Sequence, residues 1–143
     1  MEHPAEHTIP TSMCWELLRD ASFGRVALSV EALPMILPVE YSLDGEELAI
    51  CLGQYRLNDR TVNNAVVGFA ADAIDPVTRT GWTVQVQGVA RLPRQVGVPT
   101  ECGQPTAGQI VHLTPQTISG QHLQPCPFGT GLPARPPPKS SPP

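Results

Sequence analysis

The sequence predicts a small, mainly β domain in which one short helix precedes six or seven antiparallel strands that close into a barrel. Apolar residues follow helical spacing near the N-terminus and change to strict alternation after residue 24, which is the period of half-buried strands. Turns that contain Asp-Gly, Gly or Pro separate the alternating runs, as in antiparallel hairpins. The length of 143 residues fits a single domain.

Residues 1–10 carry no apolar period and are predicted to form a flexible arm. A helix is expected next, because Thr11 or Ser12 can cap its first turn and Gly24 can end it. One face of this helix is apolar at the spacing i, i+3, i+4 and i+7, through Cys14, Leu17, Leu18 and Ala21.

Three strands are expected in the next part of the chain, at residues 26–30, 35–43 and 48–52. The Asp44-Gly45 pair predicts a tight hairpin between the second and third, because glycine tolerates the positive φ that such a turn needs. Pro38 lies in the middle of the second strand and cannot donate a ladder hydrogen bond. We therefore expect an edge, a bulge or an open mouth at that position.

Residues 53–64 lose the alternation and predict a loop that leads into a short helix. Residues 65–71 are almost continuously apolar, so this strand is expected to be buried on both faces. Asp75 and Pro76 open a turn into a long strand at 82–92, in which Gly88 predicts a bulge or bend.

The C-terminal part begins with a loop at 93–108 and continues with two short closing strands at 110–113 and 117–123. Proline dominates residues 125–143, which predicts a disordered tail with polyproline character. The barrel domain is therefore expected to span residues 11–124.

Composition and charge narrow the classes of function. The hydrophobic fraction of 41% can supply a core, and the net charge of −4, without a basic block, argues against nucleic-acid binding. The apolar runs are shorter than the roughly 20 residues of a membrane-spanning helix, and the N-terminus lacks a signal-peptide pattern. We expect a soluble, cytoplasmic protein that binds neither nucleic acid nor membrane.

The four cysteines form no C-x-x-C pair, and two of them lie in apolar patterns where a thiol packs as a small hydrophobe. We therefore expect reduced thiols and no metal centre. The cysteines are Cys14, Cys51, Cys102 and Cys126.

Four motifs occur in an order that resembles the pyridoxamine 5′-phosphate oxidase-like, flavin-binding split-barrel superfamily. They are the helix and G-R-V strand at 17–30, P-x-x-x-P-V-x-Y at 34–41 with its Asp-Gly hairpin, V-V-x-F followed by D-x-I-D at 66–75, and G-W-T-V-x-V-x-G-x-A at 81–90. The last motif is similar to the G-W-S-V-x-V-x-G-x-A signature of short actinobacterial-type members. The resemblance covers residues 12–123.

The resemblance implies a homodimer of split β-barrels with FMN or a deazaflavin in a groove at the dimer interface. A barrel this short also leaves apolar surface uncovered, which independently favours pairing with a second copy. Many members perform two-electron redox chemistry, for which the cofactor supplies the reactivity. Other members only bind heme or flavin, so the fold alone does not define the activity.

The resemblance also suggests residues for the cofactor site. Arg56 stands where members carry the lysine of an R-T-x-x-G-x-K phosphate segment, and arginine can grip a phosphate through two hydrogen bonds. Arg60 follows one helical turn later. The residues expected to hold the cofactor are Pro38, Val39, Glu40, Tyr41, Leu52, Gly53, Arg56, Leu57, Arg60 and Trp82.

Three positions depart from the family pattern: the Arg-Thr pair of the phosphate segment is missing, Glu40 replaces Asn or His, and Gly120-Gln121-His122 replaces an arginine-rich segment. Two hypotheses follow. The first is a flavin- or deazaflavin-dependent oxidoreductase that transfers a hydride to or from a small-molecule substrate. The alternative is a cofactor-poor dimer that acts as a binding or interaction protein.

Several candidate residues also have plainer interpretations. Arg56 and Arg60 are equally typical of the exposed face of a short helix, and Trp82 of a residue that packs in the core. His112 and His122 can act as proton donors or lie as ordinary surface histidines. The catalytic residue is left unassigned.

Overall fold

The computed structural model describes residues 7–53, 55–92 and 109–125. Most of the expected arm, the loop at 93–108, the tail beyond Pro125 and two of the cysteines (Cys102 and Cys126) lie outside these ranges. In the described part of the chain no helix combines the length and the apolar character needed to cross a membrane.

Six antiparallel strands close into a barrel in the order β7-β4-β3-β2-β5-β6, with β6 pairing back to β7, and β1 adds to the outer side of β7. The predicted mainly β, six- to seven-stranded antiparallel barrel with one or two helices is confirmed. The elements are β1 (Thr8–Ile9), α1 (Thr11–Asp20), β2 (Phe23–Val30), β3 (Leu33–Asp44), β4 (Glu47–Cys51), α2 (Asp59–Val62), β5 (Val66–Ile74), β6 (Gly81–Arg91) and β7 (Ile110–Leu123).

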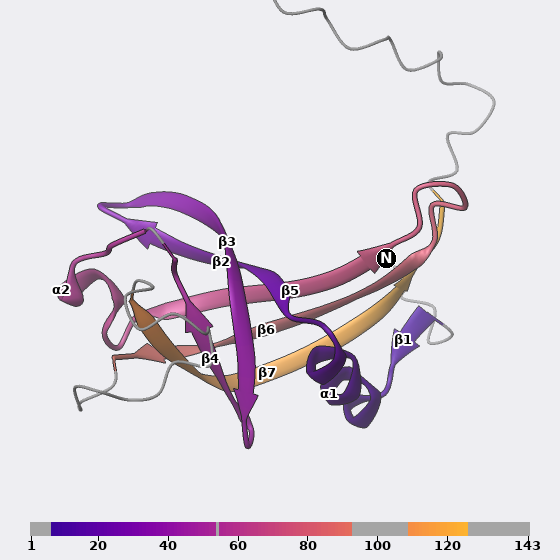
Figure 1. Ribbon diagram of the computed structural model, residues 1–143, viewed down its shortest axis with the longest axis horizontal. Coiled ribbons are helices and arrows are strands. Elements are labelled where there is room, and N and C mark those ends of the chain that lie inside the picture. Colours follow the sequence, from indigo (N-terminus) through magenta and orange to yellow (C-terminus); the bar gives the residue numbers. More distant parts are fainter. Residues whose placement is uncertain (1–6, 54, 93–108, 126–143) are drawn as a thin grey trace, which may run out of the picture.

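The long strands β5, β6 and β7 run side by side from the end of the barrel near α2 to a far end beyond it (Figure 1). Helix α1 and strand β1 lie against this far part of the sheet (Figure 1). The molecule therefore has a barrel end closed by α2 and an extended end flanked by α1 and β1.

The predicted Asp44-Gly45 hairpin is present, and a second hairpin joins β2 to β3. Glu31 and Ala32 connect β2 to β3 with φ angles of 51° and 68°, and Gly45 lies in the β3–β4 turn with a φ of 65°. Such left-handed residues match the twist of the flanking strands. Strand β4 pairs with β3 only from Glu40 onward, so Pro38 lies where β3 has one free edge, as its missing N–H requires.

Helix α1 has a different cap from the one expected. Pro10, rather than Thr11 or Ser12, is the N-cap residue, and no side chain caps the first turn. The helix also ends well before Gly24, which lies in β2. A Cβ at Gly24 would meet the ring of Phe69, so close packing between strands, and not a helix end, explains the glycine.

A buried hydrogen bond ties α1 to the barrel. The Tyr41 hydroxyl on β3 donates to the carbonyl oxygen of Leu18 on α1, at 2.6 Å. The last carbonyls of a helix have no partner within it, so this bond supplies a donor to an otherwise unpaired oxygen. The Tyr41 ring also packs edge-on against Phe69, with ring centroids 4.8 Å apart.

Part of the expected N-terminal arm is structured. Thr8 and Ile9 pair with Gln121 and Gly120 of β7, and the Ile9 side chain is buried. The prediction of an arm through residue 10 is therefore wrong for β1. A two-residue strand is too short to show a period in the sequence.

Strand β5 is not buried on both faces. Val67, Phe69 and Ala71 are buried, whereas Val66 is 73% exposed. One face lines the barrel and the other faces outward, as the closed sheet requires. The continuous apolar run in the sequence therefore reflects an apolar outer surface rather than a second packed layer.

The closing segment is one strand, not two. Gln87 pairs with Thr117 and Gly88 pairs with Pro115, so Gln116 is an extra residue in a β-bulge. The bulge lets β7 continue past the proline, and it lies opposite Gly88, where the sequence predicted a bend.

Candidate functional site

The described residues that wall the interior of the barrel leave no room for a cofactor between them. The space left inside is about 10 Å³ and is walled by apolar side chains, among them Leu52, Leu57 and Val62. This volume holds at most about one water molecule. Leu57 and Val62 come from the segment around α2 and close this end of the barrel. A ligand of flavin size must therefore bind on the outside.

A groove of about 310 Å³ runs over the outer face of β2, β3, β5 and β6, and we call it the outer groove. Its floor consists of small residues brought together by strand register: Ala27 is paired with Gly68, and Arg25 with Ala70. Because alternate residues of a strand share a face, these small side chains lie side by side and leave a depression. Taller side chains border it, namely Ile36, Gln85 and Gln87.

Polar groups at the border of the outer groove are partly fixed. The Thr117 hydroxyl donates to Oε1 of Gln87 at 2.8 Å, which leaves the amide N–H groups of Gln87 as donors. Nη1 of Arg25 lies 3.5 Å from Oδ2 of Asp72. A flat apolar ring can rest on the small residues while amide groups meet polar atoms at its edge.

The residues expected under the flavin ring divide between the two faces of β3. Pro38 is exposed and pairs with Arg25, so it lies at the border of the outer groove, and Glu40 is the next outward residue. Val39 and Tyr41 point into the barrel and are buried. Desolvation by burial raises the pKa of Tyr41 to about 12. Neither buried side chain can touch a ligand on the outer face.

The residues expected near the phosphate gather around α2. Leu52 is buried, whereas Gly53, Arg56 and Arg60 are exposed. Leu57 is half-buried, and its backbone N–H donates to the side-chain oxygen of Gln109 at 3.0 Å. This contact holds the loop before α2 against the start of β7.

The arginines and the outer groove are close along the chain. Helix α2 leads directly into β5, and the three residues from Ala65 to Gly68 span about 10 Å at the rise of a strand. Helix α2 therefore precedes the strand that supplies part of the groove floor, and Arg60 on this helix is exposed. This exposure fits both a phosphate ligand and a solvated helix face.

Trp82 lies far from this region within the chain. It stands at the start of β6. The other end of β6 meets the α2 region, because the backbone N–H of Asn64 donates to the Ala90 carbonyl at 2.7 Å. Eight residues of strand separate Trp82 from Ala90, or about 26 Å. The structure does not bring Trp82 together with Arg56 and Arg60.

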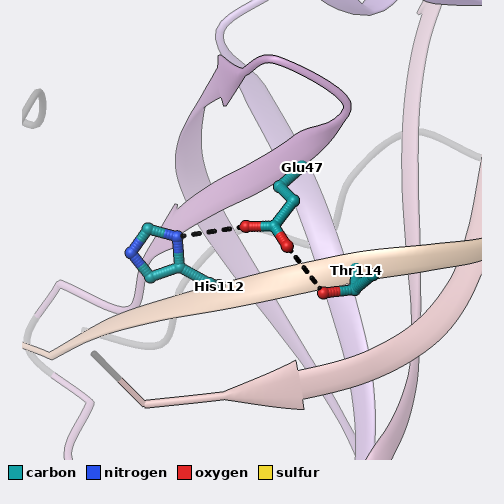
Figure 2. Close-up of polar contacts among 3 residues, drawn as sticks. All are labelled: Glu47, His112 and Thr114. Atoms are coloured by element: carbon teal, nitrogen blue, oxygen red, sulfur yellow. Dashed lines mark hydrogen bonds and ion pairs between the residues drawn. The ribbon is translucent and has the colours of Figure 1, made fainter. Parts of the chain in front are cut away.

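A second polar cluster lies on β4 and β7 (Figure 2). Nδ1 of His112 lies 4.0 Å from one Glu47 oxygen, and the Thr114 hydroxyl donates to the other at 2.9 Å. Sequence spacing suggested no carboxylate partner for His112. The pairing of β4 with β7 places the Glu47 carboxylate beside His112.

These features define the class of protein: a small antiparallel split barrel whose interior is filled and whose candidate ligand groove lies on the outer face of the sheet. A model of the pyridoxamine 5′-phosphate oxidase family matches residues 10–101, and the chain belongs to this family. The resemblance drawn from the four sequence motifs is thereby confirmed.

One curated protein is similar to this chain in sequence. An uncharacterised protein of Mycobacterium tuberculosis is 36% identical over an alignment of 83 residues, and the match covers 52% of this chain and 52% of that protein. The chain thus matches about half the length of this curated relative.

Two solved structures are similar in fold. The FAD-binding protein from Mycobacterium smegmatis has a TM-score of 0.63 at 24% identity, over 80% of this chain and 95% of that one. A flavocytochrome from Azotobacter vinelandii has a TM-score of 0.66 at 10% identity, over 99% of this chain and 87% of that one.

Sequence reasoning missed the floor of the outer groove. Ala27, Gly68 and Ala70 come from two strands, and only the register between β2 and β5 shows that they are neighbours. The sequence pattern that could have identified this floor is a set of small residues at the outward positions of strands whose inward residues are large. Gln85 and Gln87 are outward positions of the predicted strand at 82–92, and only the structure shows what they border.

Proposed function

We propose that this protein binds a flavin, either FMN or a deazaflavin, in the outer groove and transfers a hydride between the flavin ring and a small-molecule substrate. One observation carries the proposal: the outer groove has a floor of small residues that is bordered along β6 by two amide side chains. Two arginines of the α2 segment are exposed as well. The names of the FAD-binding protein from Mycobacterium smegmatis and of the flavocytochrome from Azotobacter vinelandii support a flavin as the ligand.

The ring of the cofactor is proposed to lie over Ala27, Gly68 and Ala70. These residues present almost no side chain, so a planar ring can approach the backbone closely. Gln85 and Gln87 border the floor, and their amides can pair with the ring's carbonyl and imide groups.

The phosphate of FMN is proposed to lie toward α2, near Arg60 and Arg56. Both guanidinium groups are exposed and can form paired hydrogen bonds with phosphate oxygens. The separation of about 10 Å between Ala65 and Gly68 allows one ligand to reach from the groove floor to this end.

The functional unit is proposed to be a homodimer. Three apolar side chains near the outer groove are exposed: Phe23, Ile36 and Val66, at 67%, 68% and 73%. Apolar surface of this kind marks an interaction site. A second copy placed over it would bury these side chains and shield the flavin ring from water.

When bound, the flavin supplies the redox chemistry, and the protein's role is placement. The residues of the outer groove include no histidine and no unpaired carboxylate, so its own side chains hold and orient the ring. Enclosure between two barrels would exclude water from the reacting face.

The test is a fluorescence titration of the purified protein with FMN, riboflavin, FAD and a deazaflavin. Arg56→Ala and Arg60→Ala should weaken FMN binding by roughly tenfold or more, because each removes a charge-assisted hydrogen bond. Riboflavin, which has no phosphate, should bind both variants like the unchanged protein. Arg19→Ala, on the exposed face of α1, is the matched control. Equal losses for FMN and riboflavin would remove the arginines from the site.

One observation favours the alternative function of a cofactor-poor binding dimer. Glu40 is exposed next to Pro38, and a carboxylate there opposes an anionic cofactor. A protein that forms dimers on sedimentation but binds none of the four ligands would support this alternative and reject the oxidoreductase proposal.

A further inference from the structure

The far ends of β6 and β7 hold a second groove, which we call the end groove. It is open, has a volume of about 560 Å³, and is lined by His7, Thr80, Gly81, Trp82, His122, Leu123 and Gln124. Small-molecule sites commonly measure roughly 300–1,000 Å³. The ends of β6 and β7 that carry most of these residues lie opposite α2 along the long strands (Figure 1).

The end groove is on the opposite face of the sheet from the outer groove. Trp82 shares a face of β6 with the buried Val84 and Val86, whereas Gln85 and Gln87 face outward. The two grooves are therefore separate, and occupation of one does not require the other.

An indole and an imidazole lie next to each other in the end groove. Trp82 and His122 are directly paired across β6 and β7, which places their Cβ atoms about 5 Å apart. Trp82 is half-buried, so its position is fixed while part of the ring stays open to a ligand. His122 is exposed and offers ring N–H donors beside that surface.

The charges around the end groove favour an anion over a cation. The described residues that line it include no carboxylate. The nearest acidic residues along β5 and its turn are engaged: Asp75 accepts a hydrogen bond from the Val77 backbone N–H at 2.8 Å, and Asp72 pairs with Arg25. Among the described residues no cluster of three His, Cys, Asp or Glu side chains could hold a metal ion.

We propose that the end groove binds a planar aromatic carboxylate. The aromatic ring stacks on Trp82, and the carboxylate accepts a hydrogen bond from the imidazole of His122. Stacking on an indole selects a flat π-system, while the neighbouring imidazole and the absence of lining carboxylates select a negative group. This site is independent of the flavin proposal.

The test follows the two indole N–H signals in a nitrogen–proton NMR spectrum, with 2-naphthoate as the probe and neutral 2-naphthamide as its control. Trp15→Phe assigns the signals, because the chain has two tryptophans. Naphthoate should shift the Trp82 signal saturably and leave the Trp15 signal in place. Naphthamide should bind more weakly by several-fold.

Two variants test the roles of the paired residues. His122→Ala should weaken naphthoate binding by about tenfold, the loss of one hydrogen bond to a charged group, and bring it close to that of naphthamide. His122 is exposed, so the variant keeps the fold. Trp82→Leu, checked for folding by circular dichroism, should abolish saturable binding of naphthoate. His112→Ala, which lies near the start of β7, is the control and should leave naphthoate binding unchanged.

Absence of a saturable Trp82 shift would overturn the proposal. Equal shifts of both indole signals, or equal affinity for the acid and the amide, would do the same. A flavin titration that fails while naphthoate binds would leave this site standing and reject only the function proposed for the outer groove.

Discussion

The two faces of the β2–β5–β6 sheet differ in the size of the side chains that they carry. The inner face carries branched and aromatic side chains, such as Val26, Phe69 and Val86, each at most 4% exposed. The outer face carries Ala27 and Gly68 at the adjoining positions. The same strands thus present a filled surface on one side and a depression on the other.

The inner face therefore stabilises the fold, whereas the outer face is available for binding. Inner side chains are removed from water and packed at the density of a protein interior, so their loss leaves a cavity. Outer side chains contact little within the chain, so they can vary without loss of the fold. A ligand or a partner on the outer face therefore has to supply the contacts that the monomer lacks.

The largest expected effect compares two leucines of β3. Leu37 is 4% exposed and Leu33 is 68% exposed. Leu37→Ala should lower the free energy of unfolding by about 2–5 kcal/mol, because it leaves a cavity in the core. Leu33→Ala should change it by less than about 0.5 kcal/mol. Urea unfolding of both variants measures the contrast between a core position and the exposed end of the same strand, and similar losses would contradict the burial of Leu37 in the core.

Removal of the buried hydroxyl of Tyr41 is expected to have an intermediate effect. Tyr41→Phe leaves the Leu18 carbonyl oxygen without its donor, which should destabilise the protein by about 1–3 kcal/mol. Denaturation of the unchanged protein and the variant at pH 7 gives this difference. A variant as stable as the parent would mean that water replaces the hydroxyl.

The same residue predicts a dependence on alkaline pH. Burial raises the pKa of Tyr41 to about 12, above the value of about 10 in an unfolded chain. Its contribution to stability is therefore complete below about pH 10 and is lost as pH rises toward about 12. The stability difference between the parent and Tyr41→Phe should shrink over this interval, and a constant difference would exclude the linkage.

The smallest effect is expected at the border of the outer groove. Arg25 and Asp72 lie 3.5 Å apart, with side chains 61% and 32% exposed. An exposed ion pair contributes about 0–1 kcal/mol. Asp72→Asn should therefore leave the urea midpoint almost unchanged, with any loss vanishing at high salt. A larger loss that persists in salt would show that this face is buried by a second copy.

The same contrast explains what could be predicted from the sequence. Local patterns predicted β2, β3, β6 and the Asp44-Gly45 turn, because alternation and turn chemistry act over neighbouring residues. The bend at Gly88 was predicted for the same reason. Strand β1 was missed because two residues show no period, and β7 was divided because a bulge hides its continuity at Pro115.

The candidate site was harder to predict because it depends on pairing between distant strands. Ala27 and Gly68 become neighbours only through the β2–β5 register, and His112 meets Glu47 only through β4 and β7. Trp82 was placed with the cofactor residues by its motif, but the length of β6 sets it apart from Arg56.

The most direct test of the account measures flavin binding to the parent protein and to Gly68→Val. A Cβ at Gly68 meets only the Ala27 Cβ, at 3.9 Å, so the fold accepts the larger residue while the floor of the outer groove is filled. Ser29→Val, outward on the same sheet but outside the groove, is the matched control. The account predicts one flavin per chain for the parent and for Ser29→Val, and binding weakened about tenfold or more by Gly68→Val, with unchanged stability. Equal binding by all three proteins would contradict the placement of the flavin in this groove.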